Sequence, residues 1–298
     1  MDTVIQTLVN GVALGGTYAL LAIGLAMVYS VMGLINFAHG ELLTITGYAI
    51  VGSLALGIPF WPAALVGILA AVVAAVAMER IAFRPLRGAS LETLLLSSFA
   101  ISVVLQVLFA ELISTRAKPV QTPGIFSSNI DLLGISIGSL QLVTIVVVVV
   151  LLVALTVFLR RSMLGRSIRA AGVDFEMARL VGVRANSMFL LAFALSGALA
   201  GVAGLLWVGQ RGAVDPSMGL APVIAAFLAT IIGGLGNLSG AALGGLLYGL
   251  LQTVLEQALP GSLQPYRDAI VVALVVAILL FRPNGLLSRG GIGQVREA

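Results

Sequence analysis

The sequence of 298 residues contains no cysteine and one histidine, His39. Without thiols, the chain cannot form a disulfide, an iron–sulfur site or a cysteine nucleophile, and a single histidine cannot form a multi-histidine metal site. The phosphate-binding motif G-x-x-x-x-G-K-[ST] is also missing, so this chain has no nucleotide site of that kind. We therefore expect no metal and no cofactor, and we do not expect the chain to be an enzyme.

Charge is scarce as well. Only 9% of the residues are charged and 60% are apolar, whereas a soluble domain carries charge on about 25% of its residues. The 28 charged side chains could not cover the surface of a soluble globule of this size. This composition predicts a membrane protein, and its 35 glycines predict helices that approach each other closely.

The membrane spans are predicted from uncharged runs, because about 20 apolar residues cross the hydrocarbon core. Runs of sufficient or nearly sufficient length occupy 3–40, 42–78, 93–110, 132–159, 185–210, 216–255 and 269–281. The runs 42–78 and 216–255 are each long enough for two passes. The first is interrupted by a segment with glycine and two prolines at 57–62, and the second by a glycine-rich segment at 233–240. The first run fits either one long helix followed by a re-entrant piece or two short passes. We expect an all-α polytopic membrane protein with about eight or nine transmembrane helices, broken or re-entrant segments and an internal repeat, in a single domain over 1–298.

Arginine sets the expected orientation, since loops rich in basic residues stay in the cytoplasm. Three arginines lie within 80–87, six within 160–184 and three in the tail after residue 281. The other connections mix acidic with few basic residues and are expected outside. This places the C-terminus in the cytoplasm and the N-terminus outside a bacterial-type inner membrane, although two short passes in the first run would place the N-terminus inside. The net charge of +4 is therefore interpreted as orientation in a lipid bilayer and not as nucleic-acid binding.

No ionisable residue other than tyrosine lies within 42–78, 93–110, 132–159, 185–210 or 216–255. Ion-driven transporters generally use buried charged side chains, so this absence disfavours ion coupling. A sodium site made only of backbone carbonyls at a broken helix would escape this argument. The energy for transport is therefore expected to come from a separate subunit.

The segment 160–184 contains a short predicted helix that begins after Asp174 and ends at Gly182. Asp174 is a favourable N-cap, and Gly182 stands where a glycine ends a helix. Phe175, Ala178, Arg179 and Gly182 recur at helical spacing, so they form one face that could enter a groove of a partner. The alternative is a basic helix that lies on anionic lipid.

Several stretches of this sequence resemble one family. Glu176-x-Ala178-x-x-x-Gly182 is similar to the E-A-A-x-x-x-G loop of ABC importer permeases, with Met177 in place of the first alanine. Together with N-G-V-A-L-G-G-T-Y-A-L at 10–20, G-L-I-N-F-A-H-G-E at 33–41 and G-G-L-G-N-L-S-G-A at 233–241, it resembles the LivH-type branched-chain amino-acid permeases. The resemblance runs from about residue 7 to 285 and includes R-P-N-G-L at 282–286.

The resemblance implies a permease subunit of an ATP-driven importer, with branched-chain amino acids delivered by an external binding protein. It also implies two ATP-binding subunits and a second homologous permease, a heterodimer being favoured over a homodimer. In this family the 160–184 loop would be the coupling loop, so Asp174, Phe175, Glu176, Ala178, Arg179 and Gly182 are the expected ATPase-coupling residues. Urea and short-chain amide importers have permeases of the same kind and remain alternatives. A stand-alone secondary transporter or channel is the alternative of another class.

Candidate pathway residues come from an internal echo. G-L-x-N followed by an apolar and a small residue occurs at 33–38 and again at 234–239, which is consistent with the duplications common in transporters. Asn36 and Asn237 could bind the polar ends of a zwitterion, or they could simply cap helices. His39 and Glu41 flank Gly40, close to Asn36 in the sequence. They could orient substrate at the cytoplasmic mouth, or form an ordinary solvated helix start. The glycine pairs 15–16 and 244–245 predict close helix packing.

Overall fold

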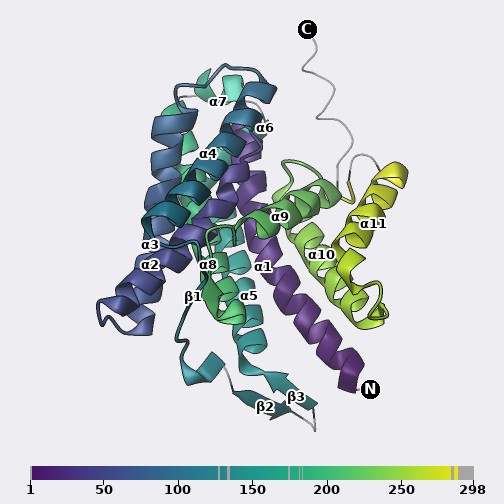
Figure 1. The fold of residues 1–298 in the computed structure, drawn as a ribbon. Helices are drawn as coiled ribbons and strands as arrows, with labels where there is room; N and C mark the ends of the chain where they lie inside the picture. Colours follow the sequence, from purple (N-terminus) through teal and green to yellow (C-terminus); the bar gives the residue numbers. More distant parts are fainter. Residues whose placement is uncertain are drawn as a thin grey trace.

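The computed structural model describes residues 2–126, 128–132, 135–173, 175–180, 182, 184–282 and 285–287. Figure 1 shows a bundle of apolar helices with a small helical cap at one end. The apolar helices are α1 (Asp2–Met32), α2 (Glu41–Ala55), α3 (Phe60–Ala77), α4 (Leu91–Leu112), α5 (Ser139–Arg161), α8 (Ala185–Arg211), α9 (Leu220–Gly233), α10 (Leu238–Ala258) and α11 (Arg267–Phe281). The cap is α6 (Met163–Val173) and α7 (Phe175–Leu180).

Short elements join these helices. They are the 3₁₀ turns η1 (Phe37–Gly40), η3 (Gly124–Phe126) and η4 (Gln264–Tyr266), the π-helical turn η2 (Met78–Phe83) and the strands β1 (Lys118–Pro119), β2 (Asn129–Leu132), β3 (Ile135–Gly138) and β4 (Ala213–Val214). β2 and β3 pair antiparallel as a hairpin, and β1 pairs with β4, which joins the segment after α4 to the segment after α8.

The predicted all-α polytopic fold is confirmed. Seven helices in the described part of the chain are long and apolar enough to cross a membrane, and α2 and α9 add two shorter apolar helices of 15 and 14 residues. The interruptions predicted within the runs 42–78 and 216–255 are confirmed, at 56–59 between α2 and α3 and at 234–237 between α9 and α10. The first apolar run forms one long helix, α1, followed by the turn η1, so the alternative of two short passes is wrong.

The expected start of the span at residue 132 is also wrong. α5 begins at Ser139, and the preceding residues form the β2–β3 hairpin with Ile130 opposite Ile137. The alternation of β-branched and small residues in I-S-I-G favours an extended chain. Absence of charge therefore placed the span correctly but began it seven residues too early.

The two ends of the bundle differ in charge. The turn between α3 and α4, the α6–α7 cap and the end of α11 lie at one end, while the N-terminus and the β2–β3 hairpin lie at the other (Figure 1). Because the arginine clusters at 80–87 and 160–184 belong to the first group, we call it the arginine-rich end.

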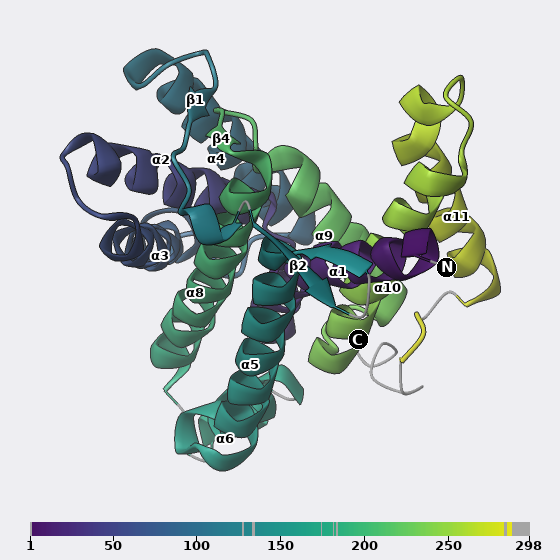
Figure 2. The same cartoon turned by 90° about the horizontal axis from the view of Figure 1, so that it is seen from below.

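α1 occupies the centre of the bundle, between α2–α4 on one side and α10–α11 on the other (Figure 2). Glycine allows its closest contacts: a β-carbon at Gly15 would lie 2.8 Å from the Leu246 Cα, and Gly245 has no room for one against Ala19. Gly16 faces Val148 of α5, and Gly244 lies against the backbone of α9. The predicted role of both glycine pairs in close packing is confirmed.

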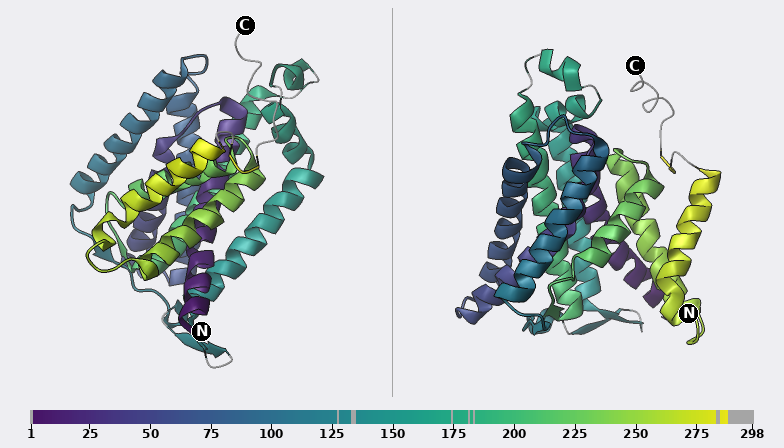
Figure 3. Two further views of the ribbon diagram at one scale, coloured as in Figure 1. Left: turned by 90° about the vertical axis from the view of Figure 1, so that its right-hand side faces the viewer. Right: turned by 45° about the horizontal axis from the view of Figure 1, so that its top comes forward.

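α5 and α11 stand at the edge of the bundle (Figure 3) and present apolar side chains outward, including Val146, Val150, Leu280 and Phe281. Soluble monomeric proteins rarely expose apolar surface of this extent to water. These faces fit lipid, in agreement with the predicted bilayer.

Candidate translocation and coupling sites

The break between α1 and α2 brings together three of the four candidate pathway residues. α1 ends before Gly33, whose φ of 67° requires glycine, and η1 begins after Asn36. Asn36, His39 and Glu41 all lie buried at this break. The alternative that His39 and Glu41 form a solvated helix start is therefore wrong, because side chains of α4 and α8 cover them.

A stripe of polar side chains on α4 faces this break. Ser98, Ser102 and Gln106 are spaced four residues apart and so lie on one side of the helix. The Ser98 hydroxyl accepts the Phe37 amide at 3.1 Å, and its one proton is shared between the Leu95 carbonyl of α4 itself, at 2.8 Å, and the Ile35 carbonyl, at 3.2 Å. A helix break in a bilayer exposes backbone groups that must find partners inside the protein. α4 supplies these partners, which sequence reasoning missed although the S-x₃-S-x₃-Q spacing marks them.

Glu41 is tied to the same stripe. Its Oε1 accepts hydrogen bonds of 2.8 Å from the Ser102 hydroxyl and from the Gln106 amide. Its Oε2 and the Oδ1 of Asn36 are buried without a hydrogen-bond partner in the described structure. Because an unpaired buried acceptor costs about 1–3 kcal/mol, these two oxygens are suited to accept a donor that arrives from outside the chain.

His39 lies on the opposite side of the break, against α8 and α1. Its Nδ1 is 3.2 Å from the Ser196 hydroxyl, and that hydroxyl donates to the Gly24 carbonyl at 3.0 Å. Because a hydroxyl carries one proton, His39 must donate from Nδ1 whenever Ser196 donates to Gly24. A β-carbon at Gly24 would lie 2.8 Å from the His39 Nε2, so glycine on α1 makes room for the ring.

Asn237 lies at the second break and has other partners. Its Oδ1 accepts the Gly240 amide at 3.1 Å, and its Nδ2 donates to the Leu287 carbonyl at 2.9 Å. The first of these bonds caps α10, as the capping alternative for Asn237 predicted. Asn36, in contrast, makes no capping bond with its side chain. The hydrogen bonds that the structure describes for Asn237 do not join it to the first break.

The predicted coupling segment forms the cap at the arginine-rich end. Gly182 has a φ of 90° and follows the end of α7, as predicted for a C-terminal glycine. The helix α6 before it was not predicted. Asp174 and the side chains of Phe175, Glu176 and Arg179 lie outside the described residues.

The predicted docking face needs a correction at Ala178. Ala178 was placed in the middle of the face that meets a partner, but only 4% of it is exposed, and it packs into the core. Its small side chain lets α7 lie close to the rest of the protein. Among the side chains of α7 that the structure describes, Met177 and Leu180 are apolar and exposed, at 62% and 81%.

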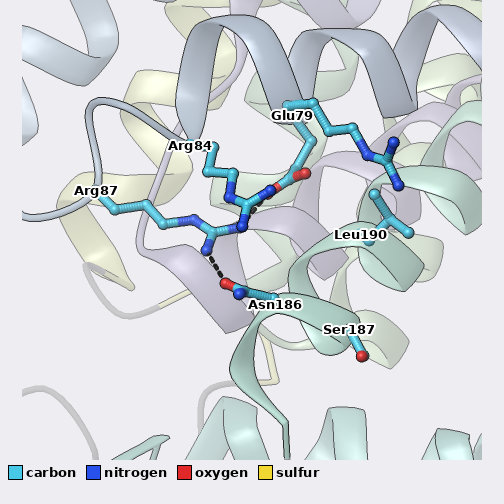
Figure 4. Close-up of a pocket in the computed structure, with 7 residues that line it drawn as sticks. Glu79, Arg84, Arg87, Asn186, Ser187 and Leu190 are labelled. Atoms are coloured by element: carbon cyan, nitrogen blue, oxygen red, sulfur yellow. Dashed lines mark hydrogen bonds and ion pairs between the residues drawn. The ribbon is translucent and has the colours of Figure 1, made fainter.

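Near this cap, an ion pair and a hydrogen bond of one arginine connect three elements. Glu79 of η2 is buried and pairs with Arg87 of the α3–α4 turn, and Arg87 also donates to the Asn186 side-chain carbonyl on α8. The Arg87 guanidinium lies 4.2 Å from the centre of the Phe189 ring, also on α8. Figure 4 shows Glu79, Arg87 and Asn186 around a pocket. The first turn of α8, directly after the coupling segment, is thus tied to the end of α3.

Comparison with known proteins gives a consistent result. The family described as "Branched-chain amino acid transport system / permease component" matches residues 7–279. The chain is 36% identical to the high-affinity branched-chain amino acid transport system permease protein BraD of Pseudomonas aeruginosa, over 98% of both chains. It is 34% identical to LivH of Escherichia coli strain K12, a permease protein of the same description, over 98% of this chain and 97% of the relative. A probable branched-chain amino acid transport permease of Methanocaldococcus jannaschii is 30% identical over 90% of this chain and 87% of the relative.

Proposed function

Because the chain belongs to the family of branched-chain amino-acid transport permeases, we propose that it is a membrane-spanning subunit of an ATP-driven importer of leucine, isoleucine and valine. The observation that carries the proposal is the match over nearly the whole chain, which includes both breaks and the coupling segment. ATP hydrolysis belongs to two separate subunits. A second homologous permease, as a heterodimer, and an external binding protein complete the transporter.

The arginine-rich end is cytoplasmic in this proposal, because basic loops stay in the cytoplasm. The N-terminus and the β2–β3 hairpin then face the binding protein. The α6–α7 cap faces the ATP-binding subunits, and Met177 and Leu180 provide the apolar surface that enters their groove. The ties from Arg87 to Glu79 and Asn186 pass a movement of this cap to α3 and α8.

The pathway is placed at the break between α1 and α2. α4 covers this break through three polar side chains, so a displacement of α4 uncovers Asn36 and Glu41 together. Their unpaired oxygens then accept hydrogen bonds from the ammonium group of an amino acid, and Glu41 supplies a complementary charge. His39 fixes the other side of the break against α8 and α1. The binding protein provides affinity, so the permease holds substrate only weakly.

The test is leucine uptake into liposomes that contain this chain, the second permease and the ATP-binding subunits, with the binding protein added outside. Uptake is expected to require ATP, and an excess of isoleucine or valine but not of urea or acetamide is expected to compete. Leu180→Asp is expected to lower ATP-driven uptake at least about tenfold, because anchor residues at interfaces contribute about 2 kcal/mol or more.

Leu56→Asp is the matched control, since Leu56 is equally exposed, at 81%, but lies in the turn between α2 and α3. It is expected to retain uptake. Uptake by this chain alone without ATP would instead identify a stand-alone transporter. Equal effects of the two substitutions would contradict the role of α7 in coupling, and competition by urea would change the substrate class.

A further inference from the structure

The pocket at the junction of α3 and α8 lies where membrane spans end. It is lined by Glu79, Arg80, Arg84, Arg87, Asn186, Ser187 and Leu190. The first four residues follow α3 directly, and the last three belong to the first turns of α8. Because α3 is apolar and charged side chains begin directly after it, lipid headgroups are expected at the level of this pocket. Figure 4 shows its lining side chains.

The charges in this pocket do not cancel. Glu79 is its one acidic residue and is paired with Arg87. Arg80 and Arg84 are exposed and take part in none of the ion pairs formed by the described residues. The Nε of Arg87 is buried without a hydrogen-bond partner. Two guanidinium groups without an ion-pair partner, those of Arg80 and Arg84, thus line the same pocket.

The remaining polar groups also favour an anion with several oxygens. The Asn186 side-chain carbonyl already accepts from Arg87, so its amide group is left as a donor. The backbone amides of the first turn of α8 carry the positive end of the helix dipole. Guanidinium groups bind phosphate oxygens in a planar, two-pronged geometry. A phosphate group satisfies this donor set, whereas a headgroup cation would find its only carboxylate already paired.

Apolar surface continues from the pocket along α3. Ile81, between the two unpaired arginines, is 77% exposed, and Leu69 and Val73 are exposed on α3. Leu69 and Val73 are four residues apart, which places them on one side of α3. A ligand that fits this surface has a phosphate at one end and hydrocarbon at the other.

We propose that this pocket binds the phosphate headgroup of an anionic glycerophospholipid, whose acyl chains lie along the exposed side of α3. Basic pockets between transmembrane helices at the cytoplasmic side are suited to such headgroups. The bound lipid holds the junction of α3 and α8 together with the ion pair of Glu79 and Arg87. This site is separate from the first break and does not depend on the transported substrate.

The test measures binding of dioctanoyl phosphatidylglycerol by native mass spectrometry, using protein extracted in mild detergent with any subunits that copurify. The Arg80→Gln/Arg84→Gln variant is expected to bind this lipid about tenfold more weakly than the unmodified protein. The Arg160→Gln/Arg161→Gln variant loses the same charge at the same end, from the end of α5, and is expected to bind normally. Dioctanoyl phosphatidylcholine is expected to bind poorly to all three.

Ile81→Glu keeps both arginines and replaces an exposed side chain, so it tests the site without disturbing packing. It is expected to weaken binding of the anionic lipid as well. Equal binding by the two double variants would overturn the proposal. Competition by millimolar inorganic phosphate would show a free-anion site instead. Loss of a copurifying subunit from the Arg80→Gln/Arg84→Gln variant with lipid binding unchanged would identify a protein carboxylate as the occupant and would also overturn it.

Discussion

The break after α1 and the break after α9 share a backbone geometry. In each, a glycine with positive φ follows the helix, at 67° for Gly33 and 105° for Gly234. Three residues later an extended asparagine starts the next helix, with φ and ψ of −98° and 95° at Asn36 and −95° and 106° at Asn237. The likeness seen in the sequence therefore extends to the backbone.

The two breaks differ in what satisfies them. Side chains of α4 satisfy the first, whereas the second is capped by its own asparagine and held by the C-terminal segment, whose Leu286 amide donates to the Ile232 carbonyl at 2.7 Å. In our proposal, a displacement of α4 uncovers the first break, whereas the cap of the second break lies within its own segment. The same local geometry thus has partners on another helix in one case and within its own segment in the other.

The largest expected effect comes from removing the α4 partner of the first break. Ser98→Val leaves the Phe37 amide without its side-chain acceptor inside the bundle. An unpaired buried donor costs about 1–3 kcal/mol, so we expect destabilisation of about that size. Thermal unfolding of the detergent-purified protein measures it, as a lower transition temperature.

Ser97→Val is the matched control, because Ser97 is the neighbouring serine on α4 but lies off the polar stripe. Ser98→Thr keeps the hydroxyl and is expected to recover part of the lost stability. If Ser98→Val unfolds at the same temperature as Ser97→Val, α4 does not hold the first break.

The second prediction is that alanine substitutions of the two asparagines have different effects. Asn237→Ala removes the cap of α10 and is expected to cost about 1 kcal/mol of stability, while uptake per folded transporter stays the same. Asn36→Ala removes no capping bond and is expected to change stability less. Because Asn36 is placed in the pathway, its replacement is expected to lower leucine uptake about tenfold, the loss of one hydrogen bond of about 1.4 kcal/mol.

Both quantities are measured on the same preparations, as the unfolding temperature and as initial uptake rate per assembled transporter. If both variants lower the unfolding temperature and leave uptake unchanged, or if both lower uptake and leave the unfolding temperature unchanged, the two asparagines do not differ in role. The shared backbone geometry would then indicate a shared role.

Sequence patterns predicted the parts of this fold that depend on local chemistry. Glycine marked both breaks and the close packing of α1 with α10, and Gly182 marked the end of α7. Two predictions were wrong. The start of α5 was placed too early because absence of charge was taken as sufficient for a membrane span. Ala178 was placed on an exposed helix face, but it is buried. The sequence of one segment does not show whether a helix face is buried or which element it contacts.

The surroundings of the candidate pathway residues could not be predicted, for the same reason. Asn36, His39 and Glu41 were found because they flank a glycine break, but their surroundings come from α4 and α8, more than 50 residues away in the chain. The polar stripe of α4 has a visible four-residue spacing, yet the spacing does not say which element it faces. The contact of Arg87 with Asn186, beside its ion pair with Glu79, could not be predicted from the sequence, because it depends on where α8 lies.

The smallest expected effect separates the two bonds of Asn237. Asn237→Asp keeps an oxygen that accepts the Gly240 amide and loses the donor to the Leu287 carbonyl. A carboxylate at the start of α10 also interacts favourably with the helix dipole, by about 0.3–1 kcal/mol, which offsets part of the lost bond. We therefore expect the unfolding temperature of Asn237→Asp to lie close to that of the unmodified protein and above that of Asn237→Ala. If Asn237→Asp is instead as unstable as Asn237→Ala, the bond to Leu287 and not the cap holds the second break, and the C-terminal segment takes the role that α4 has at the first.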